Sequence, residues 1–125
     1  MIDSNDDLWP DLTGEPEEKS PLVILREQAA ILGTKTSNLV EAEVTATPSN
    51  HDEALDIHFT LKAPVNGYEY TLLIIRQPID LYPIHLSEGK KVKNEQEFKQ
   101  YLKDLFKSER TVKIIRSFIA QGKQA

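Results

Sequence analysis

The stretch LDIHFTLKAPVNGYEYTLLIIRQ, residues 55–77, decides the fold of this chain. Apolar and polar residues alternate over 55–63, which is the period of a strand with one buried face. Asn66-Gly67 predicts a two-residue type I′ turn, because both residues accept the positive φ that this turn requires. A second strand follows over 68–77. The stretch is therefore predicted to be an antiparallel hairpin.

This turn also predicts a register. It pairs apolar residues on one face of the hairpin: Val65 with Tyr68, Ala63 with Tyr70, Leu61 with Leu72 and Phe59 with Ile74. A slip by one residue would scatter these pairs over both faces. The opposite face is mostly polar but keeps Leu73 and Ile75. Because exposed apolar side chains often mark contact surfaces, we expect these two to bind a partner or a second copy.

The flanking segments extend the hairpin to a four-stranded antiparallel meander. Alternation over 39–47 predicts one further strand, and residues 81–86 predict a short last strand, where Pro83 indicates a sheet edge. Capping residues predict three helices: Ser20 and Gly33 bound the first over 21–32, Asn94 and Glu97 start the second, and Ser108 and Gly122 bound the third. We predict an α+β domain over 20–125, with the two C-terminal helices packed on one sheet face.

Charge is distributed unevenly along the chain. Residues 1–19 hold seven acidic residues and one lysine, whereas residues 86–125 hold ten basic and five acidic residues. The first segment has too few apolar residues to offset its ordering entropy, so we predict a disordered acidic tail. Within it, Leu8, Trp9 and Leu12 stand among aspartates as a candidate linear motif for a partner. The alternatives are that Trp9 packs on its own domain, or that the tail folds back on the basic helices.

Residues typical of catalysis and metal binding are sparse. The chain has no cysteine, which excludes disulfides, thiolate catalysis and cysteine-ligated metals. Of the histidines His51, His58 and His85, the two on predicted strands lack a third ligand for a metal site. Glu41 and Glu43 are an acid/base pair only if they flank a cleft, and alternating acids are typical of a solvated strand face. We therefore expect no enzyme activity, cofactor or metal; a small hydrolytic or ligand-binding enzyme using Glu41, Glu43 or His58 is an alternative.

A basic cluster, Lys90, Lys91 and Lys93, precedes the second predicted helix. The order of helix, antiparallel strands and lysine cluster before a helix resembles the double-stranded RNA-binding domain. That resemblance implies nucleic-acid binding through these lysines. The chain departs from the domain's pattern because the lysines precede the cap Asn94, and because a fourth strand and a third helix are predicted.

Two further resemblances concern size and composition. Acidity, small size, absence of cysteine and α+β content resemble the chaperones of type III secretion effectors. The stretches ILREQA at 24–29, LVEAEV at 39–44 and 98–121 resemble small bacterial proteins of uncharacterised function. These likenesses imply a bacterial accessory protein. The first residues have neither the basic start nor the apolar run of a signal peptide, and no apolar run is long enough for a membrane span, so we expect a cytoplasmic protein.

Together these observations favour a non-enzymatic adaptor or regulatory module that acts by protein–protein contact. Its partner is another protein or a second copy of the chain. Nucleic-acid binding through the lysine cluster is the alternative, although the net charge of −5 opposes binding of nucleic acid by the whole chain.

Overall fold

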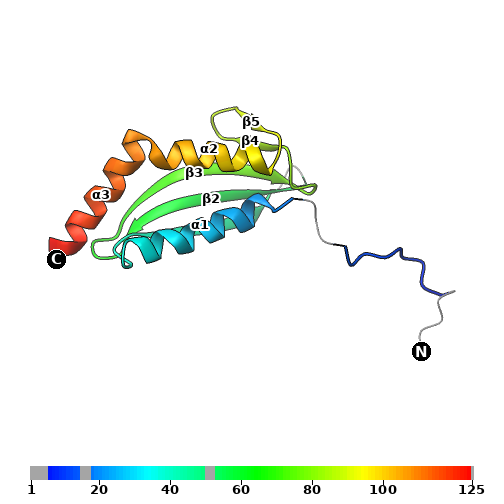
Figure 1. Ribbon diagram of the computed structural model, residues 1–125, viewed down its shortest axis with the longest axis horizontal. Helices are drawn as coiled ribbons and strands as arrows, with labels where there is room; N and C mark the ends of the chain where they lie inside the picture. The colour runs from blue at the N-terminus through cyan, green and yellow to red at the C-terminus, as the bar shows by residue number, and fades with distance from the viewer. Residues whose placement is uncertain (1–5, 15–17, 50–52, 125) are drawn as a thin grey trace.

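The computed structural model describes residues 6–14, 18–49 and 53–124, which form a five-stranded antiparallel sheet with three helices on one face (Figure 1). The strands follow each other in the sheet in chain order, as a meander. This arrangement confirms the predicted α+β class and the two C-terminal helices. The elements are α1 Pro21–Lys35, β1 Glu41–Pro48, β2 Ala54–Ala63, β3 Tyr68–Pro78, β4 Ile84–Leu86, β5 Lys91–Val92, α2 Glu95–Lys107 and α3 Glu109–Gln124.

Helix α1 begins as predicted and ends later. The Ser20 hydroxyl oxygen accepts from the N–H of Val23 at 3.2 Å, as an N-cap does. Gly33 does not end the helix, because the chain continues in helical form to Lys35. Thr36 ends it: its hydroxyl lies 3.0 Å from the carbonyl oxygens of Leu32 and Val40. The last turn of α1 is thus joined directly to the chain that enters β1.

The predicted hairpin register was wrong, and so was the turn. Ala63 pairs with Tyr68, and the N–H groups of Asn66 and Gly67 both bond to the carbonyl of Ala63, which makes a four-residue turn. Only Gly67 of the two has a positive φ, at 79°. Pro64 explains the longer turn, since its fixed φ suits the second position of a type I turn.

A bulge in β3 corrects the assignment of faces. Thr60 pairs with Thr71 but Phe59 pairs with Leu73, so Leu72 is an extra residue. The extra residue switches the alternation, and both Leu73 and Ile75 point into the core, 5% and 1% exposed. The prediction that these two side chains remain on an open face was therefore wrong. The uninterrupted apolar run at 72–75 is the feature of the sequence that accompanies this bulge.

The end of the sheet also differs from the prediction. Residues 87–93, which follow the last predicted strand, contain the short strand β5, which pairs with β4. Because β5 takes the edge, β4 is an interior strand, and Pro83 stands just before it rather than on an edge strand. The sheet is the predicted meander with one strand added.

All three helices, α1 included, share one core over the same sheet face. Ile24 and Leu25 of α1 join Phe98 of α2 and Ile114 of α3 in a single cluster of buried side chains. Aromatic contacts fix α2 and α3 over the central strands: Phe59 stacks on Phe106 and Tyr68 on Phe118. None of the helices in the described ranges is long and apolar enough to cross a membrane.

Candidate functional site

The acidic tail, of which residues 6–14 and 18–19 are described, presents apolar side chains to solvent. Leu8 is 90% exposed, Trp9 75% and Leu12 67%, the three residues that the sequence marks as a linear motif. Local hydrogen bonds shape this segment: the Asp7 carboxylate accepts from the N–H of Trp9 at 3.0 Å. The motif therefore lies open, with a backbone already turned by its own aspartates.

A second turn of the same kind lies beside Leu12. The Asp11 carboxylate accepts from the Thr13 N–H at 3.0 Å and from the Thr13 hydroxyl at 2.7 Å. These two bonds lower the pKa of Asp11 below its ordinary value, because they stabilise the carboxylate. Asp11 is thus ionised at neutral pH, and the segment is acidic as well as apolar.

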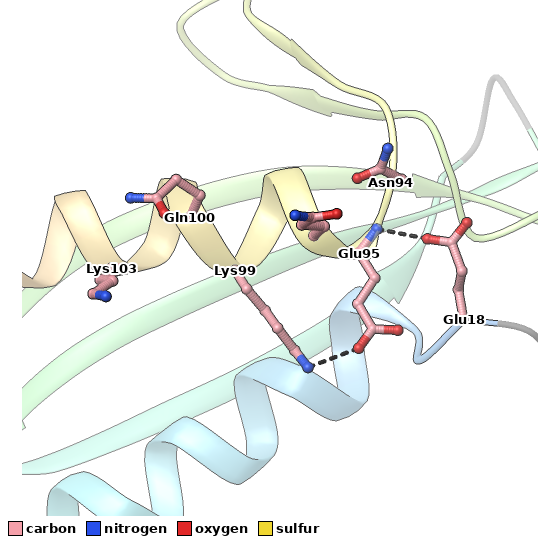
Figure 2. A pocket seen from close by; sticks show the side chains of 7 residues that line it. Glu18, Asn94, Glu95, Lys99, Gln100 and Lys103 are labelled. Carbon is pink, nitrogen blue, oxygen red and sulfur yellow. Dashed lines mark hydrogen bonds and ion pairs between the residues drawn. The ribbon is translucent and has the colours of Figure 1, made fainter.

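The tail joins the domain through a reciprocal contact with the start of α2. The Glu18 carboxylate accepts from the N–H of Glu95 at 2.6 Å (Figure 2). The Glu95 carboxylate in turn accepts from the N–H of Lys19, also at 2.6 Å. The Tyr82 hydroxyl donates to the carbonyl of Lys19 at 2.9 Å. Glu18 and Lys19, which the sequence suggested were part of the tail, are therefore held on the domain.

The charges at this junction shift two pKa values. The Lys99 ammonium, 2.7 Å from the Glu95 carboxylate, lowers the pKa of Glu95, and the N–H of Lys19 adds to the effect. Burial raises the pKa of the Tyr82 hydroxyl well above its ordinary value, and the charges of Glu95 and Glu18 raise it further. Tyr82 therefore stays protonated and acts as a hydrogen-bond donor.

A cavity of about 610 Å³ opens beside this junction, along one flank of α2. Figure 2 shows Lys99 reaching from α2 on the side of α1, with Lys103 one turn farther along. Lys99 is paired with Glu95, whereas Lys103 makes no ion pair within the described part of the chain. This part of the surface is polar and carries an unpaired positive charge.

Farther along, an apolar cavity of about 210 Å³ lies between α1 and the two C-terminal helices. Phe59 and Leu61 of β2 and the bulged Leu72 form its floor. The walls come from both sides: Gln28, Ile31, Leu32 and Lys35 from α1, Phe106 from α2 and Ile115 from α3. We call this cavity the interhelix groove.

The sequence did not predict the interhelix groove. Its clearest marker is Ile31, which is 45% exposed and lies outside the apolar stripe that Leu22, Leu25, Ala29 and Leu32 form at helical spacing. Ile31 was the available signal in the sequence, because it gives α1 an apolar residue on a second side of the helix. Which helix faces this second side depends on long-range packing, so the cavity itself could not be derived from the pattern.

The lysine cluster lies among acidic groups. Lys90 lies over the ring of Tyr101 at 5.5 Å, and the Tyr101 hydroxyl donates to Glu88 at 3.0 Å. The backbone N–H of Lys93 donates to Glu97. Glu88, Glu97 and Asp104 line the same cavity as Lys90 and Lys91. Three acids thus offset three lysines, which weakens the attraction of this surface for a phosphate backbone.

The alternative catalytic residues lie on the sheet face opposite the helices. Glu43 is bound to Lys62 at 2.8 Å, and Lys62 also contacts Glu69 at 3.3 Å, which is a cross-strand ion-pair cluster. His58 of β2 is exposed and lies opposite Thr45 of the neighbouring strand β1. His51 lies outside the described residues. In the described ranges no three histidine, aspartate or glutamate side chains are placed to share a metal ion.

Comparison of the chain with protein-family models, with curated proteins and with solved structures finds no significant match.

Proposed function

We propose that this chain is a non-enzymatic protein-binding module that presents its N-terminal tail to a partner protein. The observation that carries the proposal is the exposure of Leu8, Trp9 and Leu12 within five residues of one another. Large apolar side chains gain free energy when a partner removes them from water, and tryptophan is among the residues that dominate binding energy at interfaces.

The partner's surface would be basic around an apolar pocket. Asp6, Asp7 and Asp11 flank the three apolar side chains, so a complementary site offers cations around a cleft for Trp9. The tail would bind as an extended segment shaped by its aspartate turns, while Glu18 and Lys19 keep its root on the domain. We place such a module in the bacterial cytoplasm, as the sequence resemblances imply.

The test compares three forms of the chain as baits for proteins of the host. These are the full chain, a chain lacking residues 1–14, and the full chain with Trp9→Ala and Leu12→Ala. This deletion keeps Glu18 and Lys19, so the contacts to α2 stay intact. The control is Ile79→Ala, because Ile79 is 72% exposed and follows β3 rather than belonging to the tail.

We expect a partner that is retained by the full chain and by the Ile79→Ala variant and is lost from both tail variants. In purified form this partner should also bind a synthetic peptide of residues 1–19 and not its Trp9→Ala version. A set of bound proteins that is identical for all baits would overturn the proposal.

Nucleic-acid binding through Lys90, Lys91 and Lys93 is the alternative. The neighbouring acidic residues Glu88, Glu97 and Asp104 oppose this binding, because they repel a phosphate backbone. A gel shift at low salt that is lost when the three lysines are replaced by glutamate would support this alternative over the protein-binding one.

A further inference from the structure

The interhelix groove has the size of a side-chain pocket. Pockets for small molecules have volumes of roughly 300–1,000 Å³, whereas this cavity has about 210 Å³. Its floor of Phe59, Leu61 and Leu72 is apolar, and Ile31 leaves an apolar wall partly exposed. The groove therefore suits one or two large apolar side chains of a polypeptide.

The charges around the groove match the charge of the tail. Lys35 lies on its α1 wall, and Lys103 lies on the flank of α2 between the tail root and the groove. Neither makes an ion pair within the described ranges. The tail segment 6–14 carries three aspartates and no basic residue. An acidic and apolar segment is thus complementary to both the walls and the floor.

The length of the tail also fits. Glu18 is fixed at the start of α2, beside the first turn of α1, and the groove begins near Ile31. Ten residues of helix from Pro21 to Ile31 span about 15 Å. The six residues from Leu12 to Glu18 reach about 20 Å when extended, and Trp9 lies three residues farther out. The motif can therefore reach the groove of its own chain.

We propose that the interhelix groove binds the Leu8-Trp9-Leu12 segment of the same chain, in a closed state that alternates with the open tail of Figure 1. A short tether gives the tail a millimolar effective concentration at the groove, which favours its own chain over a second copy. The inference rests on the proposed function in one respect: the closed state hides the same side chains from the partner, so closure regulates partner binding.

Trp9 gives a direct readout, because it is the only tryptophan in the chain. The experiment measures its fluorescence emission maximum and its quenching by acrylamide, in the full chain and in a peptide of residues 1–19. We expect Trp9 in the chain to emit at shorter wavelength and to be quenched several-fold less than in the peptide. These differences should not change over a wide range of protein concentration.

The groove variant is Ile31→Asp, and its matched control is Val23→Asp on the same helix. Both residues are partly exposed, at 45% and 43%, but only Ile31 lines the groove. Ile31→Asp should give Trp9 the emission and quenching of the peptide and should increase partner binding, whereas Val23→Asp should change neither. Circular dichroism and thermal unfolding show whether each variant is folded.

Three outcomes would overturn closure. Peptide-like fluorescence of Trp9 in the unmodified chain would show that the tail stays open. An equal effect of Val23→Asp would show that the change in Trp9 fluorescence does not depend on the groove. A shift that grows with protein concentration would show exchange of tails between two copies. None of these results bears on whether the tail peptide binds a partner, so the failure of closure and that of the proposed function are distinguishable.

Discussion

The side-chain oxygen of Gln77 accepts a hydrogen bond from the backbone N–H of Leu22 at 3.0 Å, which fastens the first turn of α1 to the end of β3. Gln77 is 7% exposed, one of two buried polar residues in the described part of the chain. The first N–H groups of a helix have no partner within it, so this side chain satisfies one of them. The contact fixes the N-terminal end of α1, the helix whose later turns form one wall of the interhelix groove.

Replacing Gln77 with leucine should destabilise the fold. The substitution keeps the volume roughly but leaves the Leu22 N–H without its acceptor, at a cost of about 1–3 kcal/mol. Urea unfolding followed by circular dichroism measures the change. The control is Gln96→Leu on α2, which is exposed and should change the free energy of unfolding by less than about 0.5 kcal/mol. Equal effects of the two substitutions would mean that the buried bond contributes nothing.

The bulge at Leu72 predicts different effects for neighbouring apolar residues. Leu73→Ala and Ile75→Ala should each lower the free energy of unfolding by about 2–5 kcal/mol, because both side chains fill the core. Ile79→Ala should have little effect, since Ile79 is exposed. Denaturant unfolding of the three variants checks this order. If the Leu73 and Ile75 variants were as stable as the unmodified chain, both side chains would lie on the open face of the sheet, as simple alternation predicted.

Much of the fold follows from local chemistry. Ser20, Pro21 and Asn94 mark helix starts through caps that depend only on adjacent residues, and the alternation over β1 and β2 was visible in the sequence. The bulge was not predicted, because the apolar run at 72–75 that accompanies it does not show which residue of β3 is the extra one.

Of the candidate site, too, one part was predicted from the sequence and another part was not. The tail motif was found from the sequence, since Leu8, Trp9 and Leu12 lie within one short acidic segment. The interhelix groove was missed, because it needs α1 and α2 to lie apart over β2, and no residue pattern states the distance between two helices. The reciprocal contact of Glu18 with Glu95 was missed for the same reason, since 77 residues separate the two bonded groups.

The turn between β2 and β3 predicts an asymmetry between its last two residues, Asn66 and Gly67. Gly67 has a φ of 79°, whereas Asn66 is outside the left-handed region. Gly67→Ala should therefore destabilise the chain by about 1–2 kcal/mol, the cost of a side chain in that conformation. Asn66→Gly should not stabilise the hairpin, as it would in a type I′ turn. Thermal unfolding of both variants, with Val65→Ala as the exposed control, decides between the two turns.

Glu95 predicts a pH dependence at the root of the tail. Its folded pKa lies below the ordinary 4.5, mainly because of Lys99, so the stabilisation is present above that pH and is lost as pH falls through the folded pKa. Lys99→Gln should raise the pKa of Glu95, measured by a carboxyl carbon titration in NMR. The stability difference between this variant and the unmodified chain should shrink as pH falls below the ordinary 4.5, and it should vanish below the folded pKa of Glu95, where the carboxyl group is protonated in both chains.

Lys103→Gln is the control for this prediction, because Lys103 lies on the same flank of α2 and makes no ion pair in the described part of the chain. It should leave the pKa of Glu95 nearly unchanged, since a distant exposed charge is screened by solvent and salt. The N–H of Lys19 still bonds to Glu95 in the Lys99→Gln variant, so part of the lowered pKa should remain. An unchanged pKa after removal of Lys99 would instead assign the whole shift to the bond with the tail root.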